Sequence, residues 1–185
     1  MSPADPGGPA AAGGLDTQVG EAFSGSGPNA AHINTVLGAK GGPVETAWAT
    51  ALAMPRPGHA AFVTVIRPDV AVKPLTLFVN KAALEAGTSH AKLTWGAAQA
   101  GVASGVVDAV TAGTIPAELA DELLLIAAVW VDPAADSEEA VFENNRDATA
   151  RALARGAGGE PEWSAVQAAA AEPANPFFRQ SREKS

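Results

Sequence analysis

The chain reads Ala30-Ala31-His32-Ile33-Asn34-Thr35-Val36-Leu37-Gly38 at the place that decides its fold, an apolar strand carrying an imidazole and a carboxamide. Side chains of a strand alternate between its two faces, so His32 and Asn34 share one face and Ile33 points to the other. Turn-forming Ser, Gly and Pro residues flank the stretch on both sides, which places the polar pair near the mouth of the strand. From spacing alone, the pair is either a hydrogen-bonded structural histidine or a functional site.

Composition restricts both the architecture and the partners. The chain has 185 residues, 47% of them apolar, which suits one domain with a proper core. Its net charge of -8 argues against nucleic acid and anionic membranes, because both are polyanions. Cysteine is absent, which excludes disulfides, a thiolate nucleophile and cysteine-bound metal. A small molecule or another protein is the expected partner.

The two ends differ from the middle. Residues 1–16 are rich in Pro, Gly and Ala and predict a disordered arm, residues 17–160 predict the folded domain, and residues 161–185 predict a tail. The first residues lack the charged and apolar segments of a secretory signal. The longest apolar run, 123–131, is much shorter than the roughly 20 residues of a membrane span. These features predict a soluble cytoplasmic protein with no membrane partner.

Hydrophobic periodicity predicts strands alternating with helices. The expected strands cover residues 17–23, 30–38, 61–66, 75–81 and 123–131. An amphipathic helix is predicted from Pro43 to the Met54-Pro55 break, and a last helix from Asp136 or Ser137 to a stop at Gly156. Strand 123–131 is apolar on both faces, which predicts a helix layer on one face and another subunit on the other.

The longest predicted helix, residues 89–112, has small residues almost all round. Its glycines Gly96, Gly101 and Gly105 each cost about 1 kcal/mol relative to alanine. A sheet, a neighbouring subunit or a flat ligand is therefore expected to approach it closely. Gln99 is the polar side chain within this small-sided part, and it predicts either a structural hydrogen bond or a ligand contact.

Several short segments occur in an order and spacing that resemble the formaldehyde-activating enzyme family, the tetrahydromethanopterin hydro-lyases. They span about residues 19–160 and are Gly20-Glu21-Ala22, Ala31-His32-Ile33, Gly41-Gly42-Pro43-Val44-Glu45, Val72-Lys73-Pro74, Asn80-Lys81, Trp95-Gly96-Ala97-Ala98-Gln99 and Ala148-Thr149. The resemblance implies an α/β (α+β) two-layer sandwich with a left-handed βαβ crossover, assembled as a homopentamer with pterin sites between subunits.

The resemblance also implies the reaction. Members condense formaldehyde with tetrahydromethanopterin to methylene-tetrahydromethanopterin and water. The reduced pterin is a co-substrate, and the family uses neither a metal nor a prosthetic group. A chain without cysteine or metal-spaced histidines is consistent with that expectation.

Family positions carry over residue by residue. His32 falls on the proposed proton donor, and Lys81, Gln99 and Val63 fall on substrate-binding positions, the last replacing a common leucine. Asn34 and Ala83 depart from the pattern, since the family has aspartate and threonine there. An amide next to His32 is neutral, so we expect a weaker acid and looser pterin binding than with a carboxylate.

Two hypotheses therefore stay open. The chain is either an enzyme for the family reaction, with full or reduced activity, or a pocket that binds or senses a pterin or one-carbon compound without catalysis. His32, Lys81 and Gln99 favour the first, and Asn34 and Ala83 favour the second. His59, in a Pro-Gly turn, and His90, in a first helical turn, are alternative acids for which solvated positions are expected.

Overall fold

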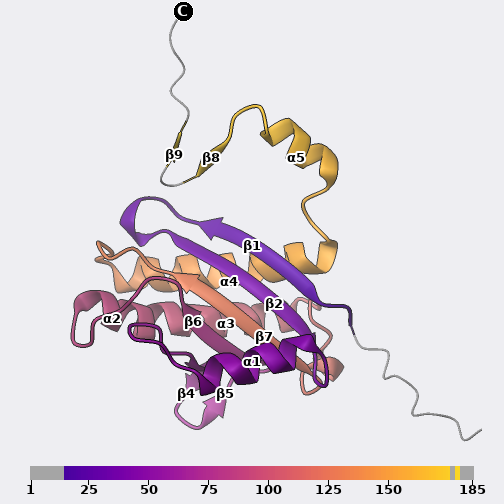
Figure 1. Cartoon of the computed structure of the whole chain (residues 1–185), viewed down its shortest axis with the longest axis horizontal. Coiled ribbons are helices and arrows are strands. Elements are labelled where there is room, and N and C mark those ends of the chain that lie inside the picture. The colour runs from indigo at the N-terminus through magenta and orange to yellow at the C-terminus, as the bar shows by residue number, and fades with distance from the viewer. Residues whose placement is uncertain (1–14, 176–177, 180–185) are drawn as a thin grey trace, which may run out of the picture.

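A five-stranded mixed sheet organises the computed structural model, which describes residues 15–175 and 178–179 (Figure 1). Its spatial order is β1-β2-β7-β6-β3, with only β6 and β7 parallel. The strands are β1 (Gln18–Ser24), β2 (Ala31–Ala39), β3 (Phe62–Val63), β6 (Leu75–Asn80) and β7 (Leu123–Trp130). A small hairpin is formed by β4 (Val65–Arg67) and β5 (Val70–Ala71), and β8 (Ala174–Asn175) pairs antiparallel with β9 (Phe178–Arg179). The predicted N-terminal arm lies almost wholly outside the described residues.

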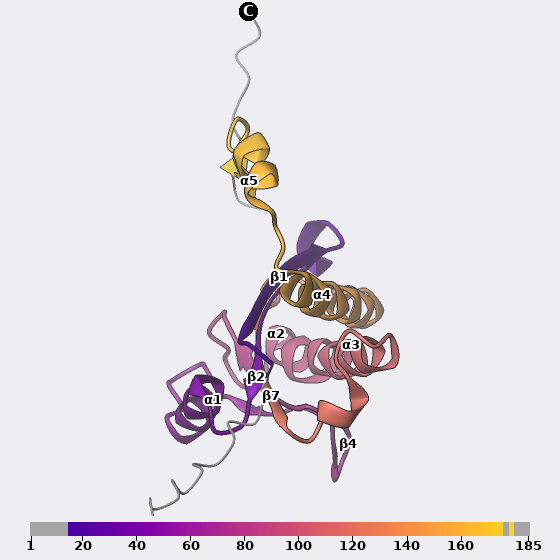
Figure 2. The ribbon, with the colours of Figure 1, turned by 90° about the vertical axis from the view of Figure 1, so that its right-hand side faces the viewer.

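Helices cover the two faces of the sheet unequally. They are α1 (Pro43–Ala53), α2 (Ser89–Leu93), the π-helical segment η2 (Thr94–Ala98), α3 (Gln99–Thr111), α4 (Glu138–Gly158) and α5 (Trp163–Ala169), with 3-10 turns η1 (Gly27–Asn29) and η3 (Ala117–Leu119). Figure 2 shows α3 and α4 side by side on one face, α1 on the other, and α5 standing apart. The predicted α/β class is confirmed as a mixed sheet with helices.

The alternation of strand residues decides which side chains enter the core. Ile33 and Leu37 of β2 are buried in the cores under α3 and α4. His32 and Asn34 are only half-buried and lie on the opposite face, which α1 covers in part. The face that carries the predicted site is thus the open face of the sheet.

Two predicted boundaries are corrected. The strand expected over residues 61–66 is divided at Thr64 into β3 and β4, because the backbone of Thr64 pairs with Thr76 on one side and Val72 on the other. The last helix passes Gly156 and ends at Gly158, followed by Gly159, whose φ of 67° suits a glycine C-cap. Its start is as predicted, since the Ser137 side chain accepts a hydrogen bond from Ala140 N.

The apolar side of the predicted amphipathic helix α1 is buried only in part, with Trp48 and Ala51 half-buried. Val44 is buried, whereas Ala47 is exposed and Leu52 is 40% exposed. The first turn packs tightly because Val44 Cγ2 occupies the space that a Cβ on Gly38 would need. The rest of the helix presents apolar side chains outward.

The small-sided helix is approached by an element that was not among the expected ones. A Cβ on Gly101 would lie 2.4 Å from Phe142 O, and one on Gly105 would lie 2.5 Å from Arg146 O. Both oxygens belong to α4 of the same chain. A bidentate ion pair from Arg146 to Asp108 also joins the two helices, with Nε 2.6 Å from Oδ2. Helix α4, and not a sheet, a subunit or a ligand, explains these two glycines.

Strand β7 is covered as predicted on one face only. Leu125, Ala127 and Val129 are fully buried towards α3 and α4. On the other face, Ile126 and Ala128 are half-buried, with α1 beside them. Cover of that face by another subunit stays a prediction.

The helix contact gives a test of the fold. Gly101→Ala should lower the free energy of unfolding by about 1–3 kcal/mol, because a methyl group there overlaps the α4 backbone. Gly96→Ala is the matched control, since a Cβ at Gly96 meets nothing within 4 Å, and it should be neutral or stabilising by up to about 1 kcal/mol. Urea unfolding of both variants measures this. Equal stabilities would contradict the close α3–α4 packing.

Candidate active site

Lys81 hydrogen-bonds to two polar residues on the open face of the sheet. It follows the last residue of β6, and its side chain reaches across β7 to β2. Its Nζ donates to Asn34 Oδ1 at 2.8 Å and lies 3.0 Å from His32 Nδ1. Strand β7 lies between β6 and β2, and its residues opposite Asn34 and His32 are Ala128 and Trp130. Three residues predicted from the sequence thus meet at one point.

The edge strand β1 adds two partners for the His32 ring. Its register places Phe23 opposite His32 and Glu21 opposite Asn34. Glu21 Oε1 lies 3.1 Å from His32 Nε2, and the Phe23 ring stacks on the imidazole at 3.8 Å between centroids and 6° between planes. Arg155 of α4 holds Glu21 in turn, donating to its backbone oxygen at 3.0 Å and lying 3.6 Å from Oε2. Both edges and one face of the imidazole are occupied.

Burial lowers the pKa of both basic groups of the cluster. It lowers the pKa of Lys81 from 10.5 to about 8, against the opposing effect of the Glu21 carboxylate. Burial also lowers the pKa of His32, as does the Lys81 charge, while Glu21 raises it. At neutral pH the lysine is therefore protonated and the imidazole is neutral. An ammonium group only donates, so His32 Nδ1 accepts and Nε2–H donates to Glu21.

The other three predicted site residues lie in different places relative to the His32 cluster. Val63 pairs with Leu77, which lies on the same face of β6 as Lys81, so Val63 belongs to the open face. Ala83 is exposed in the loop after β6, against Gly58. Gln99 begins α3 on the other side of the sheet, and its Nε2 donates to Val65 O at 2.8 Å. Within one chain, Gln99 does not join the His32 cluster.

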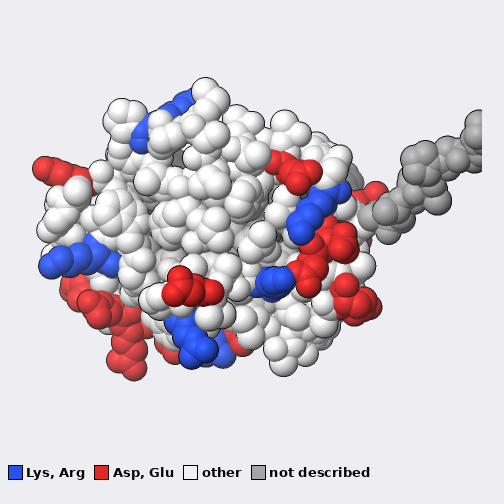
Figure 3. Space-filling model, turned by 90° about the horizontal axis from the view of Figure 1, so that it is seen from below, with Lys and Arg blue, Asp and Glu red and all other residues white. Residues whose placement is uncertain are grey.

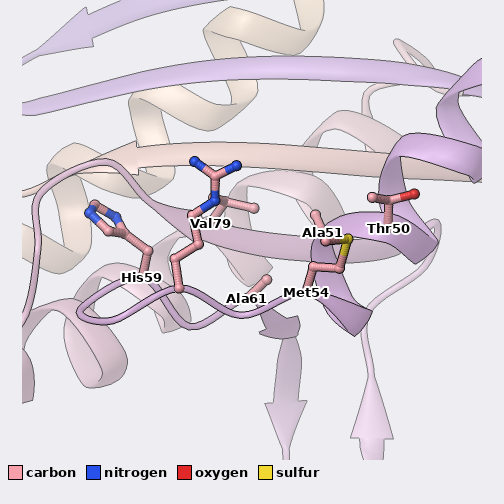
Figure 4. A pocket seen from close by; sticks show the side chains of 7 residues that line it. Thr50, Ala51, Met54, His59, Ala61 and Val79 are labelled. Carbon is pink, nitrogen blue, oxygen red and sulfur yellow. The ribbon is translucent and has the colours of Figure 1, made fainter.

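A pocket of about 250 Å³ is formed by the end of α1, the residues before β3 and the strand β6 that leads to Lys81 (Figure 4). Val79, two residues before Lys81 on the same strand face, forms part of its wall, and the other lining residues are Thr50, Ala51, Met54, Arg56, His59 and Ala61. Asn80 connects the loop before β3 to the chain just after Lys81. Its Nδ2 donates to Gly58 O and to Ala82 O, each at 2.7 Å. Most of the lining is apolar, and it includes Arg56 and His59, which suits a small amphipathic molecule.

The alternative histidines are less solvated than expected. His59 Nδ1 lies 2.9 Å from Asn80 O, and His90 Nε2 lies 2.9 Å from Val131 O. Both rings are half-buried and bound to backbone carbonyls, because the loop that carries His59 and the helix α2 that carries His90 each lie against a strand end. Neither ring is hydrogen-bonded to the His32 cluster among the described residues. The same part of the chain contains no group of three or more His, Cys, Asp or Glu suited to a metal ion.

Charge is sparse on one side of the molecule. Seen from below the view of Figure 1, the surface shows a broad uncharged area with acidic and basic groups at its margins (Figure 3). Helix α1 and the β4–β5 hairpin lie on this side in Figure 1. Their exposed apolar side chains are Leu52, Met54, Ile66 and Val70. No helix among the described residues is long and apolar enough to cross a membrane.

Comparison with known proteins agrees with the geometry. The family model described as formaldehyde-activating enzyme (Fae) matches residues 19–178. The chain belongs to the formaldehyde-activating enzyme family. It is 44% identical over 147 residues to the 5,6,7,8-tetrahydromethanopterin hydro-lyase of Methanosarcina barkeri, covering 80% of this chain and 82% of that protein.

Longer relatives carry the same family region. The bifunctional enzymes Fae/Hps of Methanothrix thermoacetophila and Archaeoglobus fulgidus are 40% and 36% identical over 148 and 152 residues. The present member of the formaldehyde-activating enzyme family spans only 38% of each of them, and they align with 80% and 82% of its own length. The predicted family, and with it the relation to a carbon–oxygen hydro-lyase, is confirmed.

The Glu21–His32 contact was not predicted from the sequence, although Gly20-Glu21-Ala22 is one of the family segments. The signal available was the period of two: Glu21 and Phe23 alternate on β1 as His32 and Asn34 do on β2. Facing pairs depend on the register of the two strands, which the intervening Ser-Gly turn does not specify. Site roles for the predicted residues stay a prediction.

The lowered pKa of Lys81 makes stability depend on pH. Between about 8 and 10.5 the unfolded chain binds more protons at this residue than the folded chain does, so raising the pH through this window stabilises the fold. Wild type should therefore gain stability relative to Lys81→Met when the pH is raised from about 7 to about 10. Thermal unfolding at both pH values measures the gap.

The control is Lys92→Met, which removes an exposed lysine of α2. Its stability relative to wild type should stay constant between the two pH values. A gap for Lys81→Met that changes no more than the control gap would contradict the burial of the Lys81 ammonium.

Proposed function

We propose that this chain condenses formaldehyde with tetrahydromethanopterin to 5,10-methylenetetrahydromethanopterin and water, as a hydro-lyase of one-carbon metabolism. The observation that carries the proposal is the Lys81–His32–Asn34 cluster: a half-buried proton-bearing pair, 3.0 Å apart, on the open face, where Val79 of β6 also lines a pocket. The proposal is supported by family membership and by 44% identity to a tetrahydromethanopterin hydro-lyase.

The chemistry explains why such a pair is needed. A pterin amine attacks formaldehyde to give an N-hydroxymethyl group, and this group must lose water before the second amine closes the methylene bridge. Hydroxide is a poor leaving group, so the oxygen needs a proton as the C–O bond breaks. A positioned acid contributes roughly 10² to 10⁴ in rate to such a step. The His32–Lys81 pair supplies this proton, and His32, the catalytic residue predicted from the sequence, is one of its two members.

Asn34, Val63, Lys81, Ala83 and Gln99 are proposed as the substrate-binding residues. Asn34 Oδ1 is engaged by Lys81, which leaves its Nδ2 to donate towards the pterin. An aspartate at this position would instead offer two acceptors for the amino groups of the pterin ring. The chain is therefore proposed to hold the pterin less tightly than relatives with a carboxylate there.

The remaining family features are proposed with the function. They are a two-layer sandwich with a left-handed crossover between β6 and β7, a homopentamer with sites between subunits, no prosthetic group and a cytoplasmic location. The broad uncharged surface around α1 and the β4–β5 hairpin supports burial against other copies of the chain (Figure 3). A site between subunits also gives Gln99 of one chain a route to His32 of another.

A binding or sensing role is the second candidate. The observation that favours it is that Asn34 and Ala83 stand where the family pattern has a carboxylate and a hydroxyl around the substrate. Such a protein would keep the pocket and the cluster, hold a reduced pterin or a one-carbon compound, and not accelerate condensation.

The direct test follows the condensation of formaldehyde with tetrahydromethanopterin above its spontaneous rate. Wild type should accelerate it, and His32→Ala should lose roughly 10² or more of that acceleration because the lysine loses its acceptor. The matched control is His90→Ala, which removes a half-buried histidine outside the cluster.

Two outcomes separate the candidates. Acceleration that arises only in Asn34→Asp would favour the binding protein. Rates equal to the spontaneous rate in wild type and in Asn34→Asp would reject the family reaction for this chain.

A further inference from the structure

We propose that Lys81 Nζ, and not the His32 ring, delivers the proton to the departing oxygen, and that Glu21 is a positioning residue that makes His32 the acceptor for Lys81. The inference rests on the proposed function and assigns the roles within its site. It differs from the sequence-based expectation, in which the imidazole itself donates.

Counting donors at the cluster leads to this assignment. A protonated lysine has three N–H groups, and Lys81 uses two of them on Asn34 Oδ1 and His32 Nδ1. The third has no acceptor among the described residues. His32, in contrast, has Nδ1 facing Lys81, Nε2 facing Glu21 and the Phe23 ring stacked on one face. The proton free to reach a substrate is therefore on the lysine.

Glu21 fixes the histidine in the required form. Its carboxylate accepts Nε2–H at 3.1 Å, which leaves the Nδ1 lone pair directed at Lys81. Arg155 holds Glu21 from α4 through the backbone oxygen and the carboxylate. The charged and titratable groups around the lysine are thus His32 on β2, Glu21 on β1 and, behind Glu21, Arg155 on α4.

The assigned step balances without a further reactant. The Nζ–H proton passes to the hydroxymethyl oxygen, the C–O bond breaks and water leaves, while the pterin nitrogen lone pair forms the C=N bond of an iminium. The second pterin amine then attacks this carbon, and the proton it loses returns to the neutral Nζ. His32 and Asn34 hold the amine in place between the two transfers. A pKa of about 8 suits both directions near neutral pH.

The first experiment needs no activity. Imidazole proton resonances of His32 are titrated by NMR in wild type, Lys81→Met and Glu21→Gln, with the exposed Glu118→Gln as control. Lys81→Met should raise the His32 pKa, because a facing positive charge is lost, and Glu21→Gln should lower it further. The control should leave it unchanged. An unaltered His32 titration in Lys81→Met or Glu21→Gln would overturn the assigned contacts.

The second experiment measures kcat/KM against pH after subtraction of the spontaneous rate. In wild type, kcat/KM should fall above about pH 8, which gives the pH profile an alkaline limb. His32→Gln should have a lower kcat/KM but the same alkaline limb, because Lys81 still titrates. Lys81→Arg keeps a charge that it cannot release, and it should lose roughly 10² or more together with the limb.

A limb that persists in Lys81→Arg but disappears in His32→Gln would show that the imidazole is the donor and overturn the proposal. Failure of wild type to accelerate condensation would instead reject the proposed function. In that case the NMR titration still decides whether Glu21 and Lys81 determine the pKa of His32.

Discussion

A half-buried ammonium group held between a neutral imidazole and a neutral amide is the interaction on which the site depends. Lys81 hydrogen-bonds to His32 and Asn34 and to no carboxylate among the described residues. Desolvation without a contacting anion explains why its pKa is lowered to about 8. The same cation suppresses protonation of the neighbouring ring, so the two groups share one proton rather than hold two.

The fold allows this arrangement because the hydrophobic core and the polar cluster lie on opposite faces of the sheet. One face of the sheet is closed by α3 and α4, which pack so closely that a Cβ added at Gly101 would lie 2.4 Å from Phe142 O. No ligand fits between two helices at that distance. The other face is closed only in part, by α1, and there the strand period aligns Glu21, His32 and Lys81 across the sheet. Stability is concentrated on one side and the polar cluster on the other.

The local sequence pattern predicted which residues share a face of the sheet. It did not predict the contacts that depend on the order and register of the strands. The period of two placed His32 and Asn34 on one face correctly, and Gly101 and Gly105, though not Gly96, correctly indicated a close neighbour. Lys81 can reach His32 because β7 is the one strand that lies between β6 and β2 in the sheet. That Glu21 reaches His32 depends on the register of β1. Both are long-range pairings that single-sequence periodicity does not encode, and for the same reason α4 was missed as the partner of Gly101.

The most direct test of the shared-proton cluster is the titration of Lys81 itself, followed by NMR through the side-chain carbon next to Nζ and assigned by its absence in Lys81→Arg. We expect a midpoint near 8, with His32 remaining neutral as the lysine titrates. A midpoint near the ordinary 10.5 would mean that the ammonium is solvated, and the proton-sharing cluster would have to be abandoned.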